Sequence, residues 1–386
     1  STTIYLPGSD QHLFMARGIL AAMEEIGWIP DVLHCNDWHT GVLPVVLRED
    51  SSERWSGTAS VFTIHNLAYQ GEFGIEIIER LGLSHGLFNM HQLETFGSFN
   101  FLKAGAVYAD QVNTVSPQYA QEIQTPEFGC RLEGLMGYLA EQGKLHGILN
   151  GIDMGEFDPA KDRHIPAHFS AADPAGKRVC KEEVLKELGL TPEPGVPLMG
   201  VVSRLSGQKG MDMMIEKAED LFALPAQLIV QGLGDAWLAE RYRELEARFP
   251  NRFRFVEKFD ADLAQRIYAG SDIFLMPSAF EPCGLGQMIA LRYGTIPVVR
   301  RTGGLANTVF EGENGFVFEH KSAEEFLASC RRAVEAYGDP ERWNRIVTTA
   351  LEGDYGWTRS AKEYEAMYER ALQALKQPAM RQPLPR

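Results

Sequence analysis

The sequence lacks long apolar runs and has fewer basic than acidic residues. No stretch of about 18 consecutive apolar residues occurs, which is the length that a membrane-spanning helix needs. Its 37 basic residues against 52 acidic ones give a formal net charge of −15. A surface of that sign repels polyanions, so a bound anion must be met by a few local cations. We therefore expect neither a membrane nor a nucleic acid as a partner.

Cysteines are also few, and their spacing excludes common cysteine sites. The five cysteines are scattered and form no C-x-x-C pair. An odd, scattered set of this kind is typical of reduced thiols inside a cell. The expected location is the cytoplasm, or a plastid if the source is a plant or alga.

Apolar and amphipathic segments alternate along the chain, most clearly from residue 197 onward. Strands are expected at 197–203, 226–231, 251–259, 272–276 and 295–299, with helices at 211–222, 235–249 and 285–293. The first half shows the same alternation, with helices at 12–26, 40–47 and 99–108 and strands at 30–34, 59–64, 112–115 and 145–149. Such rotation predicts an α/β fold with two Rossmann-like halves, each built on a parallel sheet.

The polar segment 158–197, rich in Pro, Asp and Lys, is the expected junction between the halves. This predicts an N-terminal domain over 1–195 and a C-terminal domain over 196–356. Residues 357–386 are expected to form a helix and tail that pack back towards the N-terminal domain.

One loop with two cations follows the first strand of the second half, in the run Ser203 to Gly210. Arg204 and Lys209 flank a glycine-containing turn that enters a helix. Two cations beside a helix N-terminus can bind a diphosphate. The competing interpretation is a basic turn with no ligand. The position between a strand and a helix favours the diphosphate site.

A second loop, Phe280 to Gly286, carries a lone carboxylate after the next strand. Glu281 can accept hydrogen bonds from sugar hydroxyls and stabilise positive charge at an anomeric carbon. The backbone amides of Gly284, Leu285 and Gly286 can bind phosphate oxygens. The alternative role for Glu281 is helix capping, at which Glu is poorer than Asp or Ser.

Two strand ends in the first half carry histidines. His65 follows the strand 59–64, and Asp37 and His39 follow the strand 30–34. The spacing fits no tetrahedral metal pattern, so zinc is not expected. Sugar-hydroxyl binding is favoured for His65 over a purely structural role. The acidic triplet Asp260 to Asp262 opens a helix, so capping explains it and no catalytic metal or cofactor is expected.

Together these runs resemble bacterial glycogen and starch synthases, from about residue 30 to residue 317. The matching runs are HCNDWHTG, FTIHNLAYQG, FNMHQLETFGSFNFLKAGAVYAD, TPEFGCRLEGL, GILNGID, VVSRLSGQKG, FEPCGLGQ and VVRRTGGL. The resemblance implies a GT-B fold, with two Rossmann-like domains facing across a cleft. It also implies transfer of glucose from ADP-glucose to the non-reducing end of an α-1,4-glucan, with retention of configuration.

The resemblance also implies roles for individual residues. Arg204 and Lys209 are the donor-phosphate cations, and Glu281 is the carboxylate beside the glucose. His65 and Asn150 bind the transferred glucose, Asp37 is an active-site acid, and Phe259 stacks on the nucleobase. ADP-glucose and UDP-glucose both stay open as donors.

In this family a strand and a Lys-x-Gly-Gly-Leu loop come first, and no such loop precedes residue 100. We therefore expect an incomplete N-terminal domain with an open sheet edge, and self-association through that edge. The chain is expected to bind ADP but to turn over slowly or not at all. Two alternatives stay open: another retaining GT-B transferase, and a non-catalytic nucleotide- or glucan-binding fragment.

Overall fold

The computed structural model describes residues 8–50 and 53–376, which pack as two compact units. The first unit holds the described residues up to Leu149 together with residues 358–376, and the second spans Asn150–Trp357. The sequence places this junction later, after residue 195. The structure differs because the intervening segment packs on the second unit: Lys177 donates to the backbone carbonyls of Ala269 and Tyr293 at 3.1 and 2.8 Å.

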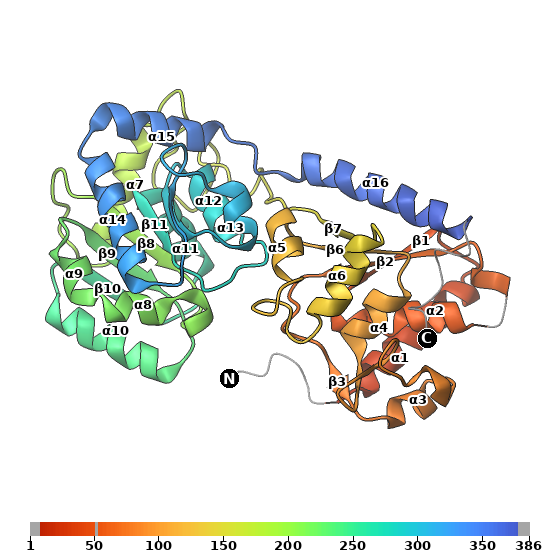
Figure 1. Cartoon of the computed structure of the whole chain (residues 1–386). Helices are drawn as coiled ribbons and strands as arrows, with labels where there is room; N and C mark the ends of the chain where they lie inside the picture. The colour runs from red at the N-terminus through yellow and green to blue at the C-terminus, as the bar shows by residue number, and fades with distance from the viewer. Residues whose placement is uncertain (1–7, 51–52, 377–386) are drawn as a thin grey trace. The chain divides into compact units, whose positions relative to one another are not determined.

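A four-stranded parallel sheet in the order β1-β2-β6-β7 forms the centre of the first unit (Figure 1). Its strands are β1 (Val32–Asn36), β2 (Ala59–Ile64), β6 (Gln111–Thr114) and β7 (Leu145–Gly147). Every residue of β2 is buried, because a central strand of a parallel sheet is covered on both faces. Within the described ranges β1 pairs with β2 alone, so β1 lies at the sheet edge.

Within the described residues, seven α-helices pack around this sheet or its loops. They are α1 (Asp10–Glu25), α2 (Leu43–Glu49), α3 (Glu76–Arg80), α4 (Phe101–Tyr108), α5 (Pro117–Glu122), α6 (Glu133–Glu141) and α16 (Trp357–Leu375). Met367 and Ala371 of α16 are buried against Ala59, Val61 and Ile148. α16 thus covers part of the N-terminal sheet.

Polar side chains also join α16 to the sheet. His34 on β1 contacts the hydroxyl of Tyr368 through Nδ1 at 2.9 Å and the hydroxyl of Thr63 through Nε2 at 2.6 Å. Thr63 donates in turn to Asn113, whose amide donates to Tyr364 at 3.2 Å. This network lies under the helix, and burial lowers the pKa of His34 to about 4, helped by the charge of His65.

A small antiparallel sheet in the order β3-β5-β4 was not expected from the sequence. It comprises β3 (Glu72–Phe73), β4 (Glu94–Thr95) and β5 (Ser98–Asn100). The predicted helix 99–108 therefore begins two residues too early. Phe99 pairs with Phe73 across the sheet, and the side chain of Asn100 caps α4 by accepting from the amide of Lys103 at 2.9 Å.

The second unit contains a six-stranded parallel sheet in the order β10-β9-β8-β11-β12-β13. Its strands are β8 (Leu198–Val202), β9 (Gln227–Gln231), β10 (Phe253–Val256), β11 (Ile273–Met276), β12 (Ile296–Arg300) and β13 (Phe316–Phe318). Its helices are α7 (Ala175–Glu187), α8 (Met211–Glu216), α9 (Ala218–Ala223), α10 (Ala236–Arg248), α11 (Ala261–Gly270), α12 (Gly286–Arg292), α13 (Gly303–Thr308), α14 (Ala323–Tyr337) and α15 (Pro340–Glu352). The helix expected at 211–222 is two helices, interrupted at Lys217.

Alternate residues of β8 face opposite sides of this sheet, and each side has its own core. Leu198 packs with Leu185 of α7 and Ile267 of α11, whereas Met199 and Val201 belong to the larger core on the other side. Helices on both faces of a parallel sheet are the arrangement that the near-continuous apolar strands predict. The expected α/β class is confirmed.

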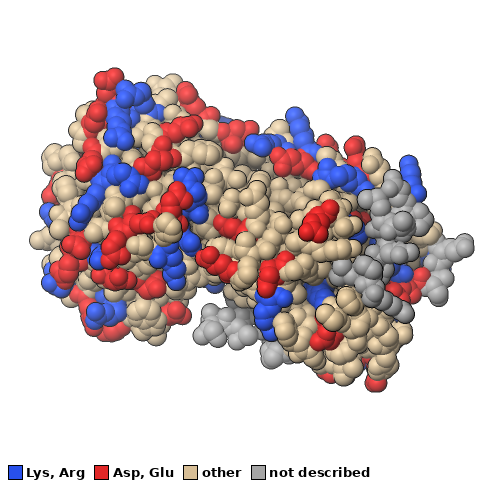
Figure 2. Space-filling model, viewed as in Figure 1, with Lys and Arg blue, Asp and Glu red and all other residues tan. Residues whose placement is uncertain are grey.

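The surface of the second unit carries both signs of charge. On the face drawn in Figure 2, acidic and basic side chains are interspersed over the unit that holds β8–β13. No helix within the described ranges has the length and apolarity needed to span a membrane.

Candidate active site

Two loops of interest in the second unit leave the sheet at its topological switch point. The strand order reverses between β8 and β11, which are neighbours in the sheet. The loop carrying Arg204 and Lys209 follows β8, and the loop carrying Glu281 follows β11. Ligands of open α/β sheets bind beyond the carboxyl ends of the strands at such a point.

The loop after β8 depends on a glycine where it approaches the loop after β11. Gly210 has φ +69°, and a Cβ there would lie 2.0 Å from the carbonyl oxygen of Pro277. A side chain is therefore excluded by both conformation and space. The amide of Ala279 donates to the carbonyl of Gln208 at 2.8 Å, which joins the two loops directly.

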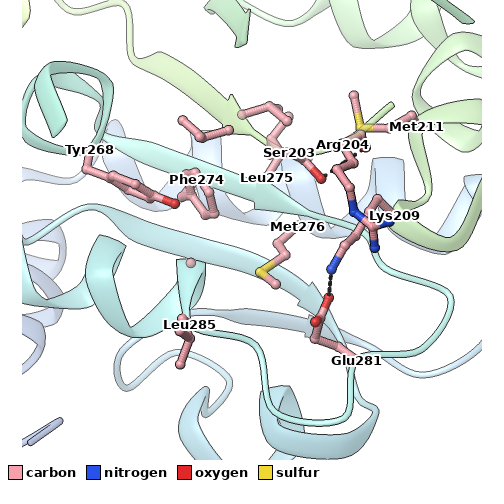
Figure 3. A pocket seen from close by; sticks show the side chains of 13 residues that line it. Ser203, Arg204, Lys209, Met211, Tyr268, Phe274, Leu275, Met276, Glu281 and Leu285 are labelled. Atoms are coloured by element: carbon pink, nitrogen blue, oxygen red, sulfur yellow. Dashed lines mark hydrogen bonds and ion pairs between the residues drawn. The ribbon is translucent and has the colours of Figure 1, made fainter. Parts of the chain in front are cut away.

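Lys209 and Glu281 meet where the loops join (Figure 3). Lys209 Nζ lies 2.5 Å from Glu281 Oε2, and Ser278 Oγ donates to the same oxygen at 3.1 Å. Glu281 is only 8% exposed. Its other carboxylate oxygen has no partner among the described residues and can accept a hydrogen bond from a ligand.

Arg204, Lys209 and Glu281 line one pocket with a volume of about 240 Å³. Gly286, Leu285 and the apolar side chains of Tyr268, Phe274 and Met276 form much of the remaining wall (Figure 3). A pocket with mainly apolar walls and a few convergent charges is typical of a small-molecule site.

Two glycines at the start of α13 pack against the backbone of the Glu281 loop. A Cβ on Gly303 would lie 1.9 Å from the carbonyl oxygen of Glu281, and one on Gly304 would lie 2.0 Å from that of Cys283. The amide of Gly304 donates to the carbonyl of Glu281 at 3.1 Å. The two glycines therefore allow α13 to approach the backbone of the Glu281 loop closely.

The turn into α12 brings Leu285 and Gly286 to the same pocket, with Gly284 next to them in the chain. Gly284 has φ +72°, and within the described part of the chain the amides of Gly284, Leu285 and Gly286 have no acceptor. Asn150 comes close to this turn from a distant part of the sequence. Burial raises the pKa of the Cys283 thiol to about 12, opposed by a hydrogen bond with the backbone of Asn150, so Asn150 lies beside this turn.

Phe259 differs from the sequence expectation in its local structure. The strand β10 ends at Val256, three residues earlier than predicted, and Phe259 lies in the following loop with 87% of its surface exposed. The strand ends early because β9 ends there too: Gly232 donates to the carbonyl of Val256 at 3.1 Å, and Lys258 then turns back onto Val256. Phe259 is therefore not a core residue.

In the first unit, Asp37 and His65 lie at the ends of the neighbouring strands β1 and β2. Asp37 Oδ1 accepts from the backbone amide of His65 at 2.8 Å, and His65 Nε2 lies 2.9 Å from Asn36 Oδ1. Asp37 adopts φ 55°, an unfavourable conformation for a non-glycine residue. These contacts bring the two predicted residues together and orient the imidazole ring.

Metal-binding groups do not gather in the described ranges: no three His, Cys, Asp or Glu side chains lie close enough to hold an ion. The acidic triplet serves the helix, as predicted. Asp260 caps α11 by accepting from the amide of Leu263 at 2.9 Å, and Asp262 pairs with His164 at 3.0 Å.

Sequence reasoning missed two residues that position others. Ser278 holds the Glu281 carboxylate, and Asn36 holds the His65 ring. Both have polar side chains and lie one or two positions beyond the apolar run of a strand. A polar residue at that position was the signal in the sequence that could have identified them.

Comparison with known proteins identifies the family of both units. The family model for the starch synthase catalytic domain matches residues 4–137, and that for glycosyl transferases group 1 matches residues 196–336. The chain is 45% identical to glycogen synthase from Anaeromyxobacter sp. (strain Fw109-5), over 94% of this chain and 78% of the relative. It is 44% identical to glycogen synthase from Desulforudis audaxviator, over 93% and 73% of the two chains.

Solved structures agree with this assignment. The catalytic domain of starch synthase IV from Arabidopsis thaliana, bound to ADP and acarbose, superposes with a TM-score of 0.88 at 32% identity, covering 96% of this chain and 79% of that one. Sucrose-phosphate synthase from Thermosynechococcus elongatus shares the fold alone, with a TM-score of 0.62 at 19% identity over 97% and 82% of the chains. The chain therefore belongs to the glycogen and starch synthase family of glycosyltransferases and has the GT-B fold.

Proposed function

We propose that this glycosyltransferase transfers glucose from ADP-glucose to the non-reducing end of an α-1,4-glucan with retention of configuration. One observation carries the proposal: Arg204, Lys209 and Glu281 line a single pocket at the switch point of the second sheet. Two cations beside one carboxylate suit a substrate with a diphosphate next to a sugar. Starch synthase IV, the structural relative described above, holds ADP and acarbose.

Each side chain then has a chemical role. Arg204 and Lys209 stabilise the negative charge that develops on the departing nucleoside diphosphate, assisted by the amides of Gly284, Leu285 and Gly286. Because these groups supply the positive charge, no metal ion is required. Glu281 stabilises positive charge at the anomeric carbon and accepts from a glucose hydroxyl through its unpartnered oxygen.

The remaining predicted residues bind the transferred glucose, the acceptor and the nucleobase. Asn150, beside the Glu281 turn, contacts the transferred glucose together with His65, and Asp37 is an acid of the acceptor-side half. Phe259 offers an exposed ring against the nucleobase. We place the enzyme in the cytoplasm, and self-association stays a prediction.

Donor competition tests the proposal. The protein is incubated with glycogen and either ADP-[14C]glucose or UDP-[14C]glucose, with and without EDTA, and radioactivity in precipitated glycogen is counted. We expect faster incorporation from ADP-glucose, unaffected by EDTA. If radioactivity is incorporated from UDP-glucose and not from ADP-glucose, ADP-glucose is not the donor. If EDTA abolishes activity, the phosphate site is not metal-free.

A further inference from the structure

The first unit exposes an aromatic ring on a backbone that disfavours it. Phe96 and Gly97 form the two-residue turn between β4 and β5, where Thr95 pairs with Ser98. Both turn residues have positive φ, 49° and 84°. Turns of this kind select Asn-Gly or Gly-Gly, because a bulky side chain is unfavourable in the left-handed region. The Phe96 ring is nevertheless present there, and 73% of its surface is exposed.

A second left-handed segment supports the same ring. Cys130 and Arg131 have φ values of 49° and 73°, and the Arg131 guanidinium lies 5.1 Å from the centroid of the Phe96 ring. With Asp37, these are the non-glycine residues of positive φ in the described ranges. Unfavourable backbone conformations persist where the surroundings enforce them, and they cluster at functional sites.

The cation beside the ring is paired with a carboxylate. Arg131 Nη2 donates to both carboxylate oxygens of Glu72 at 3.0 Å. The Arg131–Glu72 pair carries no net charge, so this surface does not favour an anionic ligand. The site instead presents an apolar ring with one face towards the guanidinium, beside polar atoms that can exchange hydrogen bonds with hydroxyl groups. This chemistry suits a neutral sugar, whose ring has an apolar C–H face and hydroxyls at its edge.

This surface is joined to the loop that carries His65. The buried side chain of Gln70 donates to the carbonyl of Cys130 at 2.8 Å and accepts from Asn100 at 2.6 Å. The amide of Phe101 donates to the carbonyl of Gly71 at 3.0 Å. The hairpin, the 130–131 turn and the loop after β2 therefore form one hydrogen-bonded assembly within the first unit.

We propose that Phe96, Arg131 and Glu72 form a glucan-binding surface, on which a glucose unit of the acceptor chain stacks on the Phe96 ring. The choice of an α-1,4-glucan rests on the proposed function. The surface contacts the acceptor away from the reacting end, so it raises affinity for long chains and takes no part in bond formation.

Binding of maltoheptaose to the full chain, without nucleotide, tests this site by calorimetry. Phe96→Asn removes the ring and suits the left-handed backbone, whereas Phe96→Tyr keeps the ring. Phe14→Ala is the matched control, since Phe14 is an equally exposed phenylalanine on α1. We expect Phe96→Asn to weaken binding about tenfold, and Phe96→Tyr and Phe14→Ala to bind as the wild type does.

Thermal melting separates binding from a structural role. Because Asn relieves the unfavourable backbone conformation, Phe96→Asn should melt at the same temperature as the wild type or about 2 °C higher. Unchanged maltoheptaose affinity in Phe96→Asn would overturn the inference, and so would a lower melting temperature, which would mean that the ring stabilises the hairpin. If glucose transfer fails but Phe96-dependent binding persists, the proposed function is wrong and this inference stands.

Discussion

Lys209 has one negative partner in the free protein and, in our proposal, a second in the donor phosphates. Its amine lies 2.5 Å from Glu281 Oε2, and Ser278 donates to the same oxygen. The carboxylate is thus held at one oxygen by two donors. Because Lys209 contacts the carboxylate and, in our proposal, the donor phosphates, substitutions here should separate effects on turnover from effects on donor binding.

Glu281→Gln should lower kcat by roughly 10²-fold or more, because the charge that stabilises the transition state is lost. ADP affinity should not weaken, since Lys209 no longer has a competing carboxylate. Steady-state kinetics and ADP calorimetry measure both quantities. Near-normal turnover in this variant would remove Glu281 from the mechanism.

Arg204→Ala and Lys209→Ala should instead impair donor use. A charge-assisted hydrogen bond contributes about 1.5–3 kcal/mol, so each loss should lower kcat/KM for the donor roughly 10- to 100-fold. Lys186→Ala is the control, because Lys186 is an exposed lysine on α7 of the same unit that pairs with Glu183. Equal effects of all three substitutions would indicate a general charge effect in place of a phosphate site.

Phe259→Ala should weaken competitive inhibition by ADP by about 1–3 kcal/mol, the stacking contribution of an aromatic side chain to a base. Trp237 supplies a matched control, because it is also an exposed aromatic residue of the second unit. If the two alanine variants give the same ADP inhibition constant as the wild type, Phe259 does not contact the nucleobase.

At the scale of helices and strands, the pattern of apolar residues predicted the buried strands of the parallel sheets. The strand 59–64 was predicted with its observed bounds, because all six of its residues are buried. The small sheet β3-β5-β4 was missed since its strands have only two or three residues each, too few for a period to show.

The same limit applies to the candidate site. Arg204, Lys209 and Glu281 were predictable because each follows an apolar strand of four or five residues, and the switch point brings such loops together. The Lys209–Glu281 pair joins residues 72 positions apart, and the support of Glu281 by Gly303 depends on backbone approach. Neither contact leaves a local pattern in the sequence.

The stability of the protein should depend on pH through His34, which lies under α16. Burial keeps His34 neutral in the native state, with a pKa of about 4, whereas an unfolded histidine has a pKa near 6.5. As pH falls from about 6.5 towards 4, the unfolded chain binds a proton that the native state does not, so stability should decrease across this window.

Chemical denaturation at pH 7 and pH 5 measures this dependence. His34→Gln, which keeps a polar side chain but cannot titrate, should show a smaller loss of stability between the two pH values than the wild type. His320→Gln is the control, since that histidine is exposed on the second unit. An identical pH dependence in His34→Gln and the wild type would exclude His34 as its source.

For the whole molecule, the two units carry complementary parts of the proposed chemistry. The second unit holds Arg204, Lys209 and Glu281 in one pocket, and the first holds His65, Asp37 and the Phe96 surface. Family membership rests on both, because the starch synthase match covers residues 4–137 and the glycosyl transferase match covers residues 196–336. Glucosyl transfer should therefore require the full chain.

Proton NMR of the full chain with ADP-glucose and maltoheptaose tests the central claim most directly. The account predicts that ADP and a new α-1,4-linked terminal glucose accumulate in equal amounts, with the α-anomeric signal present from the first spectrum. It also predicts that Glu281→Gln slows the accumulation of both ADP and the new terminal glucose roughly 10²-fold or more. Release of free glucose with ADP, a β-linked product, or wild-type accumulation in Glu281→Gln would contradict the account.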